Sequence, residues 1–181
     1  MDTAFSPLGA LIATARAGCD WIASLPDGTY AATVGSPGAT LGAHFRHHLD
    51  YLEALARGLP AGTIDYDDRA RDARCETDRD YAIARSRRLE GLLAALAESS
   101  DAYGSRTVQV RECCDPESSP EWLASSVARE VQAVLSHSVH HFAILVALGR
   151  AAGLTADAAP SLAPSTRRHR DKASAALATP G

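Results

Sequence analysis

The chain has 181 residues, with 18 lysines and arginines against 22 aspartates and glutamates, and a formal net charge of −4 at pH 7. This length fits one domain with a substantial core, and the negative charge, with arginines interleaved among acids, argues against nucleic acid as a partner. Because no uninterrupted apolar run approaches the roughly 20 residues that span a bilayer, and the N-terminus lacks the basic segment of a secretion signal, we expect a cytoplasmic protein with no membrane partner.

Two amphipathic helices are predicted in the first third of the chain. From about residue 5 to residue 24, apolar residues recur at steps of three and four, which is the helical period. The segment 25–38 is rich in proline and glycine and cannot hold regular structure for long. Thr40 is therefore the predicted N-cap of a second helix, which runs to about Arg57 and ends at Gly58.

A polar connection and a third helix follow. The segment 60–76 is too polar and too aperiodic for a packed element, so we expect a loop that crosses the molecule. Thr77 is the predicted cap of the third helix, which keeps helical spacing to about Ala97. Its first turn carries Asp78 and Asp80, which are favourable at the positive end of the helix dipole.

The next segment contains a candidate β-hairpin and the fourth helix. Val108 and Val110 alternate with polar neighbours, so residues 106–113 and 121–124 are predicted to pair. The fourth helix is the most hydrophobic of the set, which is typical of a helix that faces several neighbours. Ser125 or Ser126 is its predicted cap, and it ends near Gly149 or Gly153.

The predicted elements define an all-α fold. Four helices joined by connections of unequal length indicate a four-helix bundle, with the short β-hairpin before the last helix. This domain covers residues 1–154. After Leu154 the chain has too few large apolar residues to pack, so residues 155–181 are predicted to be a flexible, largely disordered tail.

Six of the seven histidines fall in two clusters, one in the second predicted helix and one in the fourth. His137 and His141 stand four residues apart, so they share a helix face and can bind one metal ion. His44, His47 and His48 form the other cluster, and the fold can bring a third imidazole to the same ion. The alternative is a set of buried histidines whose nitrogens are satisfied by hydrogen bonds in the core.

The two clusters resemble the helix signatures of the DinB family of bacterial four-helix proteins, also called DinB and YfiT-like. The segments concerned are residues 41–50 (LGAHFRHHLD) and 136–142 (SHSVHHF), and the resemblance covers about residues 5–152. In that family one histidine of the second helix and two of the fourth hold a divalent metal. The second-helix ligand stands three residues before an aspartate, which points to His47, and the fourth-helix signature points to His137 and His141. His44 and His48 remain competitors for the second-helix position.

The resemblance also implies a type of chemistry. Characterised relatives include thiol transferases and an isomerase that use mycothiol or bacillithiol, so we expect a metal-dependent enzyme that transfers a low-molecular-weight thiol to a small electrophile. Zinc and nickel are the expected metals, with iron and manganese as alternatives, because imidazole selects weakly among them. The alternative function is a non-catalytic bundle that binds a metal or a small ligand. A homodimer formed through an exposed helix face is a further expectation.

Polar residues around the expected metal have candidate roles. His44 and His140 are candidate proton carriers, and His140 lies about 100° around its helix from His141. Asp50 stands one turn after His47 and either orients an imidazole or pairs with an arginine.

Three arginines are candidates for binding a substrate carboxylate, because guanidinium groups match carboxylates in a bidentate way. They are Arg69, Arg71 and Arg129. The alternative is a set of structural salt bridges with the nearby acids Asp65, Asp67, Asp68 and Glu130. The four cysteines are scattered along the chain, and we interpret them as reduced thiols.

Overall fold

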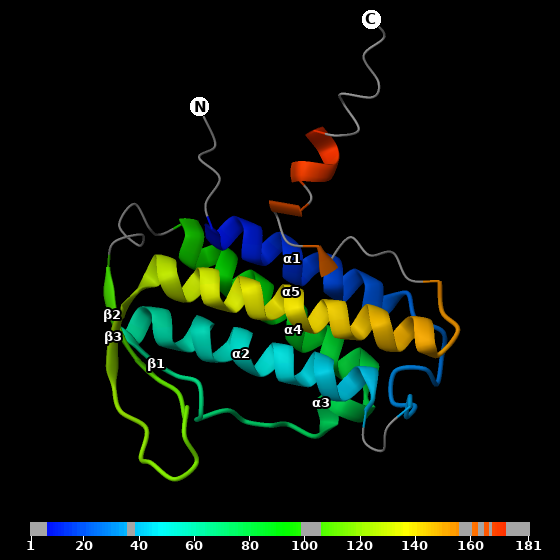
Figure 1. Ribbon diagram of the computed structural model, residues 1–181, viewed down its shortest axis with the longest axis horizontal. Coiled ribbons are helices and arrows are strands. Elements are labelled where there is room, and N and C mark those ends of the chain that lie inside the picture. The colour runs from blue at the N-terminus through cyan, green and yellow to red at the C-terminus, as the bar shows by residue number, and fades with distance from the viewer. Residues whose placement is uncertain are drawn as a thin grey trace, which may run out of the picture.

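The computed structural model describes residues 7–35, 39–98, 106–155, 161–162, 165–166 and 168–172. This part of the chain is mostly helical, with a small three-stranded sheet at one end of the helices (Figure 1). The long helices are α1 (Pro7–Ala23), α2 (Leu41–Ala61), α4 (Arg79–Glu98) and α5 (Val127–Ala151).

The long helices pack side by side and enclose the core. α1 contacts α4 and α5, and α2 contacts the same two helices. In Figure 1, α2 and α5 lie in front and run in opposite directions, with α4 behind them. The largest fully buried side chains come from all four helices and include Leu11, Ile22, Phe45, Leu52, Leu93, Phe142 and Leu145.

The predicted start of α2 is confirmed, but its predicted end is wrong. The Thr40 side chain accepts a hydrogen bond of 2.9 Å from the Ala43 backbone N–H, as an N-cap does. The helix continues past Gly58 to Ala61 and ends at Gly62, whose φ of 77° is left-handed. Gly58 instead allows Ile64 to pack closely against the helix, because a Cβ at this position would lie 2.6 Å from Ile64 Cγ1.

The segment 60–76, which we predicted to be a loop, contains two short elements. Strand β1 (Thr63–Asp65) follows α2, and helix α3 (Arg74–Thr77) precedes α4. Thr77 is therefore the last residue of α3, and the cap of α4 is Asp78, whose Oδ1 accepts a hydrogen bond of 2.9 Å from the Tyr81 N–H. Asp78 and Thr77 are both good capping residues, so the sequence alone did not separate them.

The predicted hairpin is confirmed and is part of a larger sheet. β2 (Thr107–Arg111) pairs antiparallel with β3 (Leu123–Ser126). β1 adds a parallel edge to β2, with Ile64 opposite Val110. The last residue of β3, Ser126, caps α5 by accepting a hydrogen bond of 3.3 Å from the Arg129 N–H. The sheet thus connects the end of α2 to the start of α5.

Helix α5 is long and apolar enough, by length and composition alone, to cross a membrane. Polar residues interrupt the apolar positions of this helix, which is why the sequence contains no uninterrupted apolar run of membrane-spanning length. Val131, Val134, Phe142 and Leu145 of α5 are buried in the protein, and a core helix of this kind meets the same criterion.

The predicted tail, residues 155–181, lies mostly outside the described residues. Within it, residues 168–172 are helical and exposed.

Candidate metal centre

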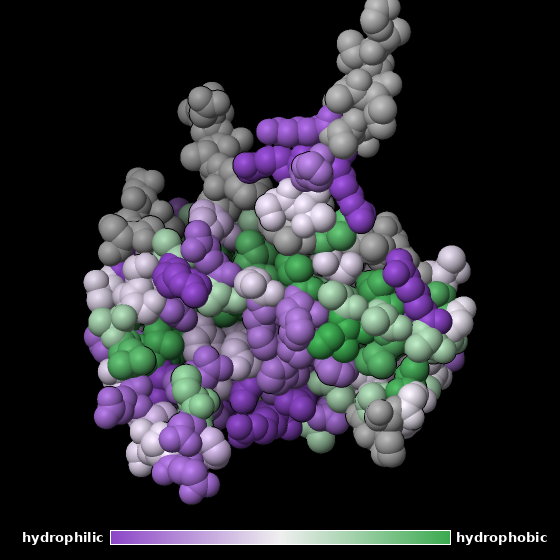
Figure 2. Space-filling view, in the orientation of Figure 1, coloured by the Kyte–Doolittle hydropathy of each residue, from purple (hydrophilic) through white to green (hydrophobic). Residues whose placement is uncertain are grey.

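Three histidines from two helices meet where α2 packs against α5. They are His47 of α2 and the pair His137 and His141 of α5, and their candidate ligand atoms all lie within 4.8 Å of one another. The ring centroid of His141 lies 4.7 Å from that of His47 and 4.4 Å from that of His137. In the view of Figure 2, hydrophilic side chains gather where the middle of α5 passes α2. The structure thus brings the three predicted ligands together in a group that can hold a metal ion.

The hydrogen bonding and the protonation of these imidazoles are compatible with metal binding. His137 Nε2 and His141 Nδ1 are buried without a hydrogen-bond partner among the described residues, and an unpaired buried polar atom costs about 1 to 3 kcal/mol. Burial, and then the neighbouring His141, lowers the pKa of His137 to about 3. Burial, and then His47, lowers the pKa of His141 to about 3 as well. Both rings are therefore neutral at pH 7, which is the form that binds metal ions.

The other three clustered histidines have separate environments. His48 is completely buried, with its ring centroid 4.8 Å from that of Phe142, and neither of its nitrogens has a hydrogen-bond partner in the described part of the chain. His44 is half-buried, and its ring centroid lies 5.6 Å from that of His141. His140 is exposed and meets the His141 ring edge-on at 5.4 Å. The second-helix member of the group is therefore His47, while His44 and His140 lie beside His141.

Two further residues contact the histidines. Tyr51 stacks on His137 with ring centroids 3.9 Å apart. The Arg69 guanidinium lies 4.8 Å from the centroid of the Tyr51 ring, and its Nη1 lies 3.5 Å from His47 Nδ1. The sequence led us to interpret the tyrosines only as core and pocket-wall residues and gave Tyr51 no place beside the candidate ligands, although its position four residues after His47 puts both on one helix face. This spacing of four residues is the feature of the sequence that predicts Tyr51 beside His47.

A cavity of about 450 Å³ opens beside the group and has His137 in its lining. This volume is in the range of small-molecule sites. The polar residues that line it with His137 include Tyr51, Tyr66, Glu112, Cys114, Arg129 and Glu130. Glu130 is buried and accepts hydrogen bonds from the Tyr66 hydroxyl at 3.1 Å and the Ser125 hydroxyl at 2.6 Å. We name this space the histidine cavity.

The hydroxyl of Tyr51 donates a hydrogen bond to Glu112 at the histidine cavity. Burial, and then this bond, raises the pKa of Tyr51 to about 12. The phenol is therefore protonated at pH 7. The four cysteines of the chain are free, and Cys114, although exposed, also lines this cavity.

The three candidate arginines differ in position. Arg69 contacts His47, Arg129 is exposed and lines the histidine cavity, and Arg71 is exposed and does not line it. None of them forms a salt bridge within the described residues, so the alternative of structural ion pairs is wrong there. Two of the acids concerned pair with other arginines, as Asp65 does with Arg111 and Asp68 with Arg57.

Asp50 pairs with arginines and not with an imidazole. Its Oδ2 accepts a hydrogen bond of 2.9 Å from Arg46, and its Oδ1 lies 3.4 Å from Arg85 Nη2. The carboxylate is almost completely buried. Of the two roles considered for Asp50, the structure shows the ion pair.

The fold and the site together define a mostly helical protein with a three-histidine group that can hold a metal ion. The chain matches no protein-family model, and no curated protein or solved structure was found to be similar to it.

Proposed function

We propose that this chain is a divalent-metal-dependent enzyme that transfers a low-molecular-weight thiol to a small electrophile. The proposal includes a DinB-like four-helix bundle, which is supported by the mutual packing of α1, α2, α4 and α5. The observation that carries the proposal is the meeting of His47, His137 and His141 beside a cavity of about 450 Å³. Zinc and nickel are the proposed metals, with iron and manganese as alternatives, and the cytoplasm is the proposed location.

The three histidines would hold the ion. A divalent ion bound by neutral imidazoles keeps its full charge and supplies Lewis acidity, which lowers the pKa of a bound water or thiol. Tyr51 orients the His137 ring by stacking on it. His44 and His140, whose rings lie near that of His141, are the proposed proton carriers.

Arginines at the site provide binding energy for an anionic substrate. Arg129 lines the histidine cavity without an ion pair among the described residues, and Arg69 contacts His47. Guanidinium groups in these positions favour an electrophile that carries a carboxylate. Arg71 is the weakest of the three candidates, because among the described residues it neither lines this cavity nor contacts a histidine of the group.

Metal content tests the first part of the proposal. We expect about one divalent ion per chain, by mass spectrometry, in untagged protein purified without chelator. His47→Ala, His137→Ala and His141→Ala should each lose it, because two imidazoles hold a divalent ion less tightly than three. His140→Ala, on the same helix but exposed, is the matched control and should retain the metal. Full metal in all three ligand variants would contradict the site.

Turnover tests the second part. A screen of low-molecular-weight thiols against small electrophiles should find an activity that chelation abolishes and added metal restores. Arg129→Gln should raise the KM for a carboxylated electrophile about tenfold, because a charge-assisted hydrogen bond is lost. The KM for an uncharged electrophile should not change.

The alternative function is a non-catalytic metal-binding bundle. It is supported by the origin of the ligands in two helices, since a metal there would link α2 to α5. This alternative predicts the same metal content and a loss of thermal stability on chelation, but no turnover with any pair of thiol and electrophile. Metal-dependent turnover would exclude it.

A further inference from the structure

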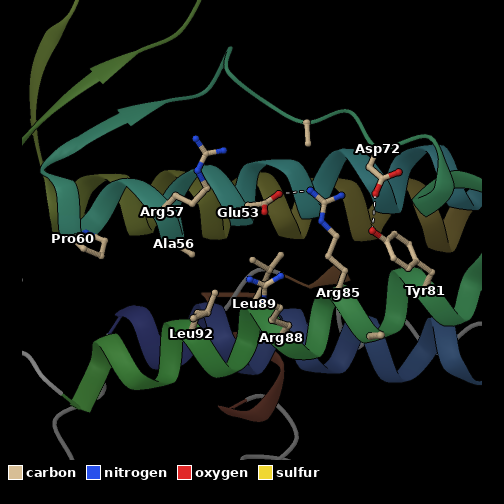
Figure 3. A pocket seen from close by; sticks show the side chains of 12 residues that line it. Glu53, Ala56, Arg57, Pro60, Asp72, Tyr81, Arg85, Arg88, Leu89 and Leu92 are labelled. Atoms are coloured by element: carbon tan, nitrogen blue, oxygen red, sulfur yellow. Dashed lines mark hydrogen bonds and ion pairs between the residues drawn. The ribbon is translucent and has the colours of Figure 1, made fainter.

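A second cavity of about 640 Å³ lies between α2 and α4, and we name it the α2–α4 cavity. Of the residues that the structure describes, none lines both this cavity and the histidine cavity. Figure 3 shows α2 on one side of it, α4 on the other, and the segment that leads from β1 to α3 passing along α2. Its volume is also in the range of small-molecule sites.

One end of the α2–α4 cavity is lined by polar groups that have partners within the protein. Arg85 of α4 donates a hydrogen bond to Glu53 of α2, and the Tyr81 hydroxyl donates one of 2.9 Å to Asp72 (Figure 3). Arg85 also pairs with the buried Asp50. The charges at this end therefore have partners within the protein.

The other end is apolar and carries cationic groups without strong partners. Ala56 and Pro60 of α2 and Leu89 and Leu92 of α4 line it (Figure 3). Leu92 is 45% exposed, which makes it one of the few exposed large apolar side chains among the described residues. Apolar surface is therefore available to a ligand at this end.

Two arginines line the cavity together with this apolar surface. Arg88 forms no salt bridge within the described part of the chain. Arg57 has one contact of 3.4 Å with Asp68, and both side chains are more than half exposed, so that this pair contributes little. Arg57 and Arg88 both line the cavity, and their positive charge favours an anion.

The segment beside the cavity has an unusual backbone position. Ala70 and Asp72 both line the cavity, and Arg71 between them has a φ of 46°. A positive φ is unfavourable for a residue with a side chain. Strained positions persist where the surrounding structure enforces them, and they are frequent in ligand-binding segments. Here Asp72 is held by Tyr81 and by the Arg74 N–H at 3.0 Å.

We propose that the α2–α4 cavity binds a small amphipathic monoanion, such as an apolar carboxylate. Its apolar body lies against Ala56, Leu89 and Leu92, and its anionic group pairs with Arg88, assisted by Arg57. This site is separate from the metal centre and does not depend on the proposed enzymatic function.

Octanoate is the probe for this site, and isothermal titration calorimetry on the full chain measures its binding. We expect one octanoate per chain. Acetate lacks the apolar body and octanamide lacks the charge, so each should bind at least tenfold more weakly. Absence of octanoate binding at millimolar concentration, or equal binding of octanamide, would overturn the proposal.

Variants locate the bound octanoate. Arg88→Gln and Leu92→Glu should each weaken binding about tenfold or more, because the first removes a charge-assisted hydrogen bond and the second places a negative charge on the apolar surface. Both residues are exposed, so the fold should be retained, which circular dichroism checks.

Two matched variants exclude the metal centre as the octanoate site. Arg129→Gln removes an exposed arginine from the histidine cavity, and His137→Ala disrupts the metal group. Neither should change octanoate affinity. Loss of binding in these two variants, with binding retained in Arg88→Gln and Leu92→Glu, would place octanoate at the metal centre and overturn the proposal.

Discussion

Neighbouring histidines on α2 have different environments because successive residues point about 100° apart around a helix. His47 faces the pair on α5, whereas His48 enters the core beside Phe45 and Phe142. The same residue type thus serves as a candidate metal ligand at one position and as a buried polar group without a partner at the next.

Replacement of His48 tests this distinction. His48→Leu should raise the free energy of unfolding by about 1 to 2 kcal/mol, because it removes two buried nitrogens without partners. The metal content should stay at that of the unmodified protein. Denaturant unfolding and mass spectrometry measure the two quantities. A loss of metal would instead assign His48 a place among the ligands.

Asp50 provides a second prediction. Asp50→Ala leaves Arg46 and Arg85, both partly buried, with one carboxylate partner each instead of two, so it should lower the free energy of unfolding by about 1 to 3 kcal/mol. Asp27→Ala is the control, since Asp27 is 97% exposed in its pair with Arg79 and should cost less than about 1 kcal/mol. Metal content, measured on folded Asp50→Ala, should be unchanged. Selective loss of metal with normal stability would show that Asp50 orients a ligand instead.

Helix packing in this protein depends on a close approach between α1 and α5. Gly18 of α1 is buried against Phe142 of α5, and a Cβ at Gly18 would lie 2.0 Å from Phe142 Cζ. Phe142 directly follows the candidate ligand His141. The separation of α1 and α5 therefore influences where the α5 histidines lie.

Two glycine substitutions separate packing from helix propensity. Gly18→Ala should lower the free energy of unfolding by about 1 to 3 kcal/mol, because the Phe142 ring must shift in a filled core. Gly91→Ala in α4 has no atom within 4 Å of the new Cβ, and should raise stability by about 0.5 to 1 kcal/mol through helix propensity. Thermal unfolding followed by circular dichroism compares them. Equal effects of the same sign would contradict the packing account.

On the scale of the whole molecule, a bound metal would join α2 to α5 at one position while the sheet joins them at another. Segments far apart in the sequence meet at both places, since β1 pairs with β2 and β2 with β3. A ligand that binds only the folded state stabilises it in proportion to the logarithm of its concentration over its Kd.

Chelation tests this link. A metal present at about 100 times its Kd contributes about 2.7 kcal/mol, so its removal should lower the Tm by about 5 to 10 °C for a chain of this size. Differential scanning calorimetry measures the shift. His137→Ala should already have the lower Tm and should not respond to the chelator. An equal response in this variant would show that the chelator acts elsewhere.

Much of the helical architecture and part of the site followed from the sequence by itself. Helix positions and the i, i+4 pair on α5 depend on local periodicity and backbone geometry, which a single segment carries. The choice of His47 as the third ligand came from the resemblance of residues 41–50 to a family signature, and the structure places it in the group.

Only the tertiary structure decided how distant segments meet. The parallel pairing of β1 with β2, the stacking of Tyr51 on His137, the approach of Arg69 to His47 and the two cavities all join elements far apart in the chain. A three-residue strand such as β1 is too short for an alternation of apolar and polar residues to predict it from the sequence. The environment of His48 likewise depends on Phe142, which lies on another helix. These features arise from the docking of one surface on another, and no single segment of sequence contains both surfaces.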